Sequence, residues 1–367
     1  ETARRRGAEE LVVGWDPRTS SEPLAEAFLG GLGARLRVCV LGLVPTPAVA
    51  WVAQQRPGAW GLMISASHNP PADNGLKGFN HLGEKLSETD EGAIEAAFDA
   101  LAEAAPEAGH HAIQAGPTED YLTHLGGLDL PPGFKLVVDC AHGATAPWAP
   151  RLLRGPDVAF RGIPADGARI NVGVGSTHLD GLQAEVRRTG AAAGIAFDGD
   201  GDRCLFVDPE GRTVDGDQLV WLLAQALLRR QAALPGVVGT LMSNGGLEQA
   251  LKGAGVPFAR TQVGDKFMLR ELSRRGWDLA AEASGHIIQK HLGPSGDGLA
   301  TAIASLQALL HRAPEHRWDW RFTPWPLKLV NLTASERRPV EACAHLHRTM
   351  EALEAEHGDA LRIVVRW

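Results

Sequence analysis

LVVGWDPRTSSEPLAEAFLGGLGARLRVCVLGLVPTPAVAWVAQQRPGAWGLMI, residues 11–64, indicates the fold class, because short apolar runs alternate in it with longer amphipathic segments. The apolar runs have the length of buried strands, and the segments between them space their apolar residues three or four positions apart, as helices do. Strands that alternate with helices predict parallel sheets covered by helices on both faces. The predicted strands are 11–14, 37–41 and 60–64, and the predicted helices are 23–32 and 45–55.

The same alternation continues along the rest of the chain. A turn at 209–211 between two short runs predicts a β-hairpin. The segment 313–326 is rich in Trp, Arg and Pro, which predicts a linker. The further predicted strands are 134–138, 193–197, 204–208, 212–214, 237–241, 327–332 and 361–366, and the further predicted helices are 146–153, 182–188, 217–230, 244–254, 266–275, 298–311 and 340–357.

Because the strand–helix unit recurs at the scale of domains, we expect an α/β fold with three similar mixed α/β domains and part of a different, α+β fourth domain. The length of 367 residues is two to three times that of a usual single domain. The expected domains are 1–115, 116–214, 215–314 and 325–367.

The composition excludes several classes of protein. Hydrophobic residues make up 44% of the chain and charged residues 22%, as in a globular protein rather than a disordered one. A net charge of −8 argues against general binding to nucleic acid or a membrane surface but allows a local basic pocket. No apolar run reaches the roughly 18 residues that span a bilayer. The four cysteines are widely scattered, which predicts a reducing, cytoplasmic environment rather than disulfides or structural zinc.

The hexapeptide DGDGDR, residues 198–203, is the sharpest chemical signal. Its three carboxylates follow a predicted buried strand and can converge on one hard cation, while the glycines permit a tight bend. An EF-hand loop would need Gly at its sixth position and Glu at its twelfth, where this chain has Arg203 and Pro209. The remaining alternative is an acidic surface turn. The pattern favours Mg²⁺ held together with a phosphate, which Arg203 could grip.

The segment SASHNP, residues 65–70, places a serine where a predicted strand ends. A serine on such a loop can be an exposed nucleophile or carry a phosphate, although serine-rich turns after strands are common. Lys77 follows in the turn NGLK and could point an ammonium group into the same cleft. Taken alone, His68 and Lys77 are equally compatible with a structural histidine and a solvated lysine.

Two segments of the third predicted domain carry polar residues at sheet edges. In EASGH, residues 282–286, Glu282 and Ser284 lie two positions apart and project to the same side of an extended segment, which suits a grip on adjacent sugar hydroxyls. Read alone, the segment could equally be the end of a strand. GDK at 264–266 is a similar loop. The chain contains neither a Walker phosphate loop nor the dinucleotide-binding glycine fingerprint.

In this order, the three segments resemble the α-D-phosphohexomutase family. SASHNP resembles its phosphoserine loop, DGDGDR its metal loop and EASGH its sugar-binding loop. The likeness extends from Leu11 to Arg366 and implies domains arranged around a central cleft. Four other stretches look most like the bacterial phosphoglucosamine mutase branch, namely LVPTP at 43–47, GVGSTH at 173–178, GTLMSN at 239–244 and VGD at 263–265.

The resemblance implies a role for each matching residue. Ser67 would be the phosphoserine, and its phosphate would complete an Mg²⁺ site formed by three aspartates. Lys77 would be the general acid–base, with a pKa lowered by nearby cations. The implied catalytic residues are Ser67, His68, Lys77 and Arg203; the implied metal ligands are Ser67, Asp198, Asp200 and Asp202; and the implied substrate contacts are Gly264, Asp265, Glu282, Ser284, His286 and Arg366.

The activity implied by the resemblance is that of an isomerase, an intramolecular phosphotransferase. It would interconvert glucosamine 6-phosphate and glucosamine 1-phosphate through a sugar bisphosphate, on the route to cell-wall amino sugars, with a sugar 1,6-bisphosphate as activator. The alternatives are a phosphomannomutase or phosphoglucomutase, and a non-catalytic sugar-phosphate-binding protein. The expected partners are a hexosamine or hexose phosphate, without nucleic acid or membrane, in a monomer or homodimer.

The sequence departs from the family pattern at three places. The family usually begins with a Phe-Gly-Thr-Asp-Gly-x-Arg-Gly segment, and this chain starts after it. The fourth domain of the family holds the non-transferring phosphate through Arg-x-Ser-Gly-Thr, of which Arg366-Trp367 matches the first two positions. Ala281 stands where Gly is common before the sugar-loop Glu. We therefore expect the chain to be part of a longer protein, a hypothesis that a measured intact mass would test.

Overall fold

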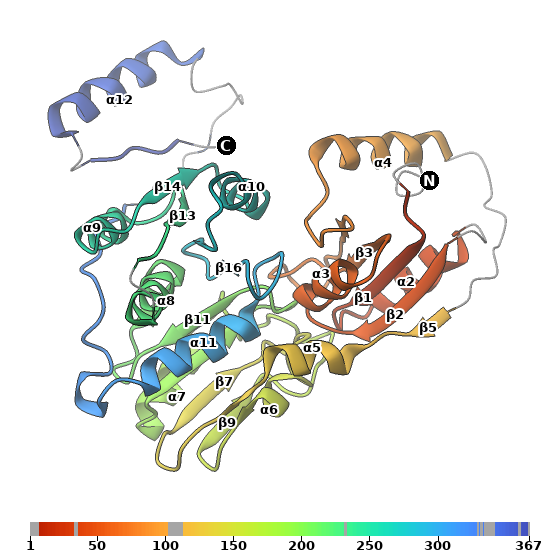
Figure 1. Ribbon diagram of the computed structural model, residues 1–367, viewed down its shortest axis with the longest axis horizontal. Coiled ribbons are helices and arrows are strands. Elements are labelled where there is room, and N and C mark those ends of the chain that lie inside the picture. The colour runs from red at the N-terminus through yellow and green to blue at the C-terminus, as the bar shows by residue number, and fades with distance from the viewer. Residues whose placement is uncertain are drawn as a thin grey trace. The chain divides into compact units, whose positions relative to one another are not determined.

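The computed structural model describes residues 7–32, 36–101, 113–230, 233–328, 330, 333, 342–358 and 361–365. The chain divides into two compact units, Glu1–Thr323 and Pro324–Trp367. The first unit contains the sheets, and each sheet can be followed by its colour in Figure 1.

Three sheets of the first unit share one topology. In each, the first strand in sequence lies between the second and the third and pairs with both of them. The fourth strand pairs with the free edge of the third in antiparallel orientation. The first three strands of each sheet run parallel, as the alternation predicted, whereas the antiparallel fourth strands make the sheets mixed. This repeat confirms the expectation of similar mixed α/β domains.

The elements of each sheet can be named in chain order. The first sheet has the order β4-β3-β1-β2-β5, the second β12-β11-β10-β7-β9 and the third β14-β13-β15-β16. The strands are β1 (Glu10–Trp15), β2 (Arg37–Leu43), β3 (Ala59–Ile64), β4 (Leu76–Phe79), β5 (Ile113–Ala115), β7 (Leu136–Asp139), β9 (Val158–Arg161), β10 (Ala193–Phe197), β11 (Cys204–Val207), β12 (Thr213–Val214), β13 (Val237–Thr240), β14 (Phe258–Thr261), β15 (Leu279–Ala281) and β16 (Ile287–Gln289), with β6 (Leu128–Asp129) and β8 (Leu153–Arg154) forming a small separate pair.

The helices complete the layers (Figure 1). They are α2 (Ser21–Gly30), α3 (Thr46–Gln55), α4 (Glu88–Leu101), α5 (Thr118–Leu125), α6 (Ala149–Leu152), α7 (Asp180–Thr189), α8 (Gly216–Arg230), α9 (Gly245–Gly253), α10 (Asp265–Arg275), α11 (Gly298–Leu310) and α12 (Ala344–His357), with a 3₁₀ turn at Pro314–His316. In the part of the chain that the structure describes, no helix combines the length and apolar character needed to cross a bilayer.

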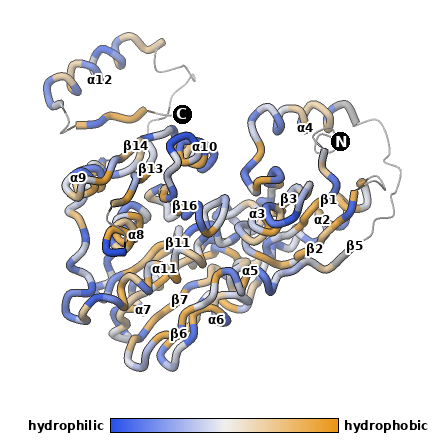
Figure 2. Tube along the Cα trace, viewed as in Figure 1, coloured by the Kyte–Doolittle hydropathy of each residue, from blue (hydrophilic) through white to orange (hydrophobic). Residues whose placement is uncertain are grey.

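Helices cover both faces of the first sheet because its strands alternate their side chains. Val12 of β1 packs in the same apolar cluster as Val49 of α3. Its neighbours Leu11 and Val13 point to the other face and pack with Phe28 of α2. Figure 2 shows the strands of this sheet and of the second sheet as mostly hydrophobic. The burial of both faces explains why these strands read as continuous apolar runs.

Most predicted bounds differ from the observed ones by one to three residues, and two predicted segments differ in kind or length. The segment 313–323 is not a linker, since Trp320 is 4% exposed and its carbonyl accepts a hydrogen bond from Trp221 of α8 at 2.9 Å. Arg321 also forms a 2.6 Å ion pair with the buried Asp208. The Trp and Arg residues of this segment therefore pack against residues of both the second and the third predicted domain. Helix α6 is shorter than predicted, because the chain turns into β8 at Leu153.

The second unit retains one of its three predicted elements. Helix α12 lies within the predicted 340–357 helix. Residues 361–365 form no strand, and neither do the described residues of 327–332; the remainder of that segment, together with Arg366, lies outside the described residues. Sequence reasoning also missed α4, α5 and the short strands at sheet edges.

Candidate active site

Three loops occupy the same position in the three repeated sheets, each joining the third strand to the antiparallel fourth. The serine loop (65–75) joins β3 to β4, the acidic loop (198–203) joins β10 to β11, and the glutamate loop (282–286) joins β15 to β16. The equivalent connection in each sheet thus carries one of the three motifs found in the sequence.

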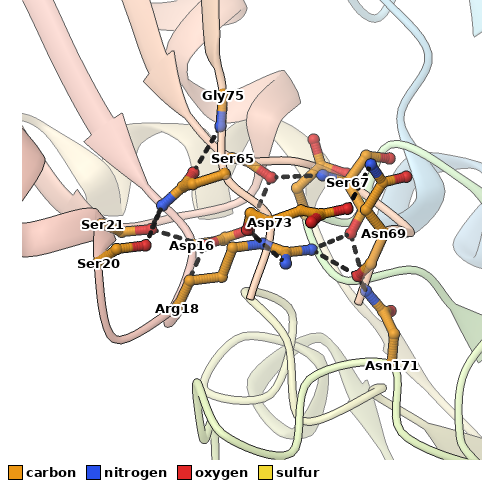
Figure 3. A network of polar contacts seen from close by, with 12 residues as sticks. Asp16, Arg18, Ser20, Ser21, Ser65, Ser67, Asn69, Asp73, Gly75 and Asn171 are labelled. Carbon is orange, nitrogen blue, oxygen red and sulfur yellow. Dashed lines mark hydrogen bonds and ion pairs between the residues drawn. The ribbon is translucent and has the colours of Figure 1, made fainter. Parts of the chain in front are cut away.

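The buried Arg18 anchors the serine loop through its planar guanidinium (Figure 3). Its side chain is 0% exposed. Its Nη2 atom donates to the carbonyls of Ser67 at 3.0 Å and Asn69 at 2.9 Å, and Nη1 donates to those of Asp73 at 2.8 Å and Pro70. One side chain therefore holds four carbonyls of the loop, which requires the several donors of a guanidinium.

Asp16 completes this anchor from the end of β1. Its carboxylate accepts hydrogen bonds from Arg18 Nε at 2.9 Å, from Ser65 Oγ at 2.7 Å and from Ser21 Oγ at 2.9 Å. Burial raises the pKa of Asp16, and these donors and Arg18 oppose the rise. The hydroxyl of Ser65 in turn accepts from the Ser67 amide at 2.9 Å. The polar turn after the first strand therefore fixes the start of the serine loop.

Ser67 points at the acidic loop. Its Oγ donates to Asp198 Oδ2 at 2.7 Å, and the residue is 8% exposed. Its φ of 53° lies in the left-handed region, which non-glycine residues seldom adopt. Such a backbone is typical of functional loops whose surroundings hold an otherwise disfavoured conformation.

The three aspartates of the acidic loop converge as the sequence predicted. One oxygen from each of Asp198, Asp200 and Asp202 lies within 4.8 Å of the others, and all three residues are buried. Burial and the neighbouring carboxylates raise the pKa of Asp198. Lys77 and His286 overcome the effect of burial and hold the pKa of Asp202 well below its usual range. Gly201 supplies the bend with a φ of 73°.

The donor set of the acidic loop fits a divalent cation. Asp200 Oδ1 and Asp202 Oδ1 are buried without a hydrogen-bond partner, which is costly for a carboxylate oxygen unless a cation completes its coordination. Carboxylate oxygens are the ligands that Mg²⁺ prefers. The acidic triad could therefore bind a metal.

Two cationic side chains, those of Lys77 and Arg203, lie close to the three aspartates. Lys77 Nζ forms a 2.6 Å ion pair with Asp200 and lies 3.8 Å from Asp202. Arg203 Nε lies 4.0 Å from Asp198 and 3.9 Å from Asp202. The expectation of a lowered lysine pKa is not met here: burial lowers the pKa of Lys77, but the aspartates outweigh it and raise the pKa. Lys77 is therefore a protonated cation in this arrangement.

His68 is exposed beside the same group of charges. Partial desolvation of its ring and the nearby Arg203 lower the pKa of His68, which favours the neutral imidazole. His68 directly follows Ser67 on the serine loop.

Thr46, the first residue of α3, is hydrogen-bonded to the acidic loop. Its amide donates to the Asp200 carbonyl at 2.9 Å, and its hydroxyl donates to the Asp200 carboxylate. Thr46 lies in the LVPTP stretch, which the sequence marked without giving it a role. The motif thus links the first predicted domain to the acidic triad of the second.

The glutamate loop is joined to the acidic loop through the backbone. The Cys204 amide donates to the Gly285 carbonyl at 3.0 Å, and Arg203 and His286 form an antiparallel bridge. Glu282 accepts from the Gly264 amide at 2.9 Å and from Ser284 Oγ at 3.2 Å. Glu282 and Ser284 are both partly exposed, so they can meet a ligand.

His286 connects the two loops to the first domain. Its Nδ1 lies 3.7 Å from Asp202 and its Nε2 lies 3.7 Å from Asp265, which pairs in turn with Lys85. Burial lowers the pKa of His286, but Asp202 and Asp265 outweigh it and raise the pKa. His286 therefore lies between Asp202 of the acidic loop and Asp265 at the start of α10.

The structure brings together nearly all the residues expected at the site. The exception is Arg366, which lies outside the described residues. Sequence reasoning missed the residues that support the loops: Asp16, Arg18, Thr46, Lys85 and Asn171.

Comparisons with known proteins agree over nearly the whole chain. Family models described as phosphoglucomutase/phosphomannomutase, alpha/beta/alpha domains I, II and III, match residues 1–105, 119–211 and 215–317. The phosphoglucosamine mutase of Chromohalobacter salexigens is 38% identical over 99% of this chain and 83% of its own length. That of Synechococcus elongatus is 42% identical over 97% of this chain and 79% of its own length.

Solved structures show the same fold. A phosphoglucomutase/phosphomannomutase family protein from Burkholderia thailandensis has a TM-score of 0.74 and 28% identity, over 85% of this chain and 71% of that protein. The N-acetylphosphoglucosamine mutase of Aspergillus fumigatus, in complex with GlcNAc-6P and magnesium, has a TM-score of 0.54 and 19% identity, over 79% and 78% of the two chains. At this identity the second likeness shows the fold alone.

Proposed function

The chain belongs to the α-D-phosphohexomutase family, and on that premise we propose that it interconverts glucosamine 6-phosphate and glucosamine 1-phosphate. Members of this family are isomerases, and so is this chain. The single observation that carries the proposal is the 2.7 Å hydrogen bond from Ser67 Oγ to Asp198, within a buried triad of carboxylates. A hydroxyl in this place can carry a phosphoryl group next to a cation.

The proposed site assigns one task to each loop. Ser67 carries the phosphoryl group, with His68 beside it. Asp198, Asp200 and Asp202, together with a phosphoserine oxygen, hold Mg²⁺, which when bound supplies positive charge for phosphoryl transfer. The proposed contacts to substrate are Gly264, Asp265, Glu282, Ser284, His286 and Arg366.

The residues of the chain would act by position and charge. Phosphoryl transfer passes through a loose transition state with charge spread over three oxygens, so cations held in place contribute most of the catalysis. Arg203 and the protonated Lys77 face that region, as their distances to the triad indicate. Lys77 would balance the charge of the phosphate and act as general acid–base: it would donate a proton to the oxygen released from phosphorus and regain one from the hydroxyl that attacks phosphorus. The partly exposed Glu282 and Ser284 would hold the sugar hydroxyls.

The wider setting follows from the same proposal. We place the domains at 1–115, 116–214, 215–314 and 325–367, and a sugar 1,6-bisphosphate would load Ser67 with phosphate. Cys39, Cys140, Cys204 and Cys343 are all free thiols, which supports a reducing cytoplasmic environment. A monomer or homodimer would suffice, because each chain supplies all three loops.

A coupled assay with glucosamine, glucose and mannose phosphates tests the proposal. We expect the highest kcat/KM with glucosamine phosphate, a requirement for Mg²⁺, and phosphate on Ser67 after incubation with a sugar 1,6-bisphosphate. A higher kcat/KM with mannose or glucose phosphate would reassign the substrate. Absence of phosphate on Ser67 together with absence of turnover would leave a non-catalytic sugar-phosphate-binding protein.

A further inference from the structure

We propose that Asn171 is a positioning residue for phosphoryl transfer. Together with Arg18 it forms a clamp, which we define as these two side chains and the Ser67 and Asn69 carbonyls that both of them bind. This inference rests on the proposed function of Ser67. Asn171 lies between β9 and α7, in the second domain, whereas Arg18 and the serine loop belong to the first. The clamp therefore makes the geometry of Ser67 a property of two domains.

Two carbonyl oxygens receive donors from both residues (Figure 3). Asn171 Nδ2 donates to the Ser67 carbonyl at 2.9 Å and to the Asn69 carbonyl at 3.0 Å. Arg18 Nη2 donates to the same two oxygens at 3.0 and 2.9 Å. A carbonyl oxygen has two lone pairs, so each of these oxygens is saturated. Rotation of either peptide would break two hydrogen bonds at once.

The clamp acts on the backbone that aims the serine. Ser67 has the unfavourable φ of 53°, and its carbonyl carbon and its Cβ are attached to the same Cα. A displacement of the carbonyl that carried this Cα with it would move the Oγ away from its 2.7 Å contact with Asp198. Holding the carbonyl therefore keeps the phosphoryl-bearing oxygen directed at the acidic loop.

The acidic loop leaves room for the clamp at Gly199. A Cβ atom at this position would lie 2.6 Å from the Ser67 carbonyl oxygen and 2.8 Å from Asn171 Nδ2. Since φ at Gly199 is not in the left-handed region, this close approach rather than backbone freedom requires the glycine. The first glycine of DGDGDR thus serves the contact between the two domains.

The backbone of Asn171 is also held in place, which fixes the direction of its side chain. Its φ of 61° is left-handed, a conformation that asparagine tolerates better than most residues, and its amide donates to the Ala141 carbonyl at 3.0 Å. Its side chain is buried, and its Oδ1 has no hydrogen-bond partner. A buried amide oxygen without a partner is costly, so the side chain is placed for the two donations of Nδ2 rather than for its own satisfaction.

Asn171→Asp and Asn171→Gly test the clamp in the full chain. The aspartate keeps the shape but turns an acceptor toward two carbonyl oxygens, and the glycine suits the left-handed backbone while removing the donors. We expect kcat to fall about 10- to 100-fold with KM for the sugar phosphate within about twofold, since misplacement by about 1 Å has such an effect. A crystal structure of either variant should show the Ser67 carbonyl rotated.

Asn80→Asp is the matched control, because Asn80 lies outside all three loops. Its Oδ1 accepts hydrogen bonds from the Leu82 amide at 2.9 Å and the Glu84 amide at 3.1 Å, and a carboxylate oxygen can accept both. We expect its kcat to stay within about twofold of the unmodified chain.

Three results would overturn the inference: an unchanged kcat in both Asn171 variants, a loss shared equally by the control, or a loss confined to KM. An unmoved Ser67 in the variant structure would overturn it even in a protein without turnover. Failure of the proposed function is separate, because it would show as absence of mutase activity and of Ser67 phosphate in the unmodified chain.

Discussion

The serine loop and the glutamate loop occupy the same connection in two repeated sheets but are held very differently. Buried donors anchor the carbonyls of the serine loop, and Ser67 itself is 8% exposed. The glutamate loop keeps Glu282 and Ser284 partly exposed, with one backbone donor and one 3.2 Å bond between the two side chains. Buried side chains therefore hold the carbonyls of the serine loop, whereas the glutamate loop presents polar side chains that a ligand can contact.

This difference matches two separate demands of a mutase. The group that transfers phosphate must stand in one geometry, because the barrier to transfer depends on alignment. The groups that hold the sugar must release it, since a bisphosphate intermediate has to turn over between two transfers. We therefore expect substitutions in the serine and acidic loops to lower kcat and those in the glutamate loop to act mainly on KM.

Ser67→Ala should have the largest effect. Without the hydroxyl there is no oxygen to carry the phosphoryl group, and we expect mutase activity to fall by about 10⁴-fold or more. The coupled assay and phosphate mapping measure this loss. Ser273→Ala, which removes an exposed hydroxyl bonded to Lys290, is the control. Mutase activity that survives in Ser67→Ala would show that the serine loop does not carry the phosphoryl group, and the comparison between the two loops would fail.

Asp200→Asn should follow. The amide keeps the volume but removes a charge from the triad and from the ion pair with Lys77, so we expect Mg²⁺-dependent kcat to fall about 10²- to 10³-fold. Calorimetric titration with Mg²⁺ should show weaker binding, while circular dichroism stays unchanged. Asp129→Asn, at a largely exposed ion pair with Arg154, is the control. Equal Mg²⁺ affinity in Asp200→Asn and the unmodified chain would count against the acidic loop as the metal site.

Glu282→Gln probes the other side of the comparison. Glutamine can still accept from the Gly264 amide but loses charge-assisted bonds to a sugar hydroxyl, so KM should rise about tenfold with kcat within about threefold. Steady-state kinetics with glucosamine 6-phosphate measure both constants. Glu248→Gln, half exposed beside Arg260, is the control. A loss in kcat alone would contradict the division between the two loops.

Glu10→Gln should have the smallest effect, because Glu10 lies outside all three loops. Its hydrogen bond to Arg56 lowers the pKa of Glu10. The ion pair therefore stabilises the fold fully above pH 4.5 and progressively less as pH falls below that value. We expect the substitution to lower the free energy of unfolding by about 1 kcal/mol at pH 7, with kcat unchanged.

Urea denaturation at several pH values measures this difference. The gap between Glu10→Gln and the unmodified chain should shrink below pH 4.5, where the carboxylate becomes protonated. A gap that widens toward acid would show that Glu10 stabilises the fold by another means.

The sequence predicted β3, β10 and β11, which border the serine and acidic loops, because their residues are fully buried and form apolar runs. It missed β4, β15 and β16, which border the serine and glutamate loops. Strand β10 was predicted with its observed bounds, and the acidic loop follows it directly. The motifs at 65–70, 198–203 and 282–286 were recognisable since each combines several residues of special chemistry in a short span. Helix α4 is mostly exposed and α5 has only eight residues, so neither contains a long apolar run. The Trp- and Arg-rich segment before Thr323 looked like a linker because composition does not reveal where aromatic residues pack.

The supporting residues were harder to predict, because their partners are distant in the chain. Arg18 contacts carbonyls some 50 positions away, and Asn171 Nδ2 reaches Ser67 across 104 positions. Every residue has a backbone carbonyl, so the sequence of the serine loop does not show which carbonyls Arg18 and Asn171 bind. A signal did exist in the polar turn after the first strand, where an Asp and an Arg two positions apart follow a fully buried run.

The common position of the three loops makes the protein modular. Each motif lies on a connection between two neighbouring strands of one sheet, so the residues of a loop can change while the order of the strands is kept. Substrate preference could therefore diverge among descendants through the glutamate loop alone, while the phosphate-carrying and cation-holding parts are inherited unaltered. The same property offers a route to chimaeras, in which a loop from a relative replaces its counterpart without redesign of the core.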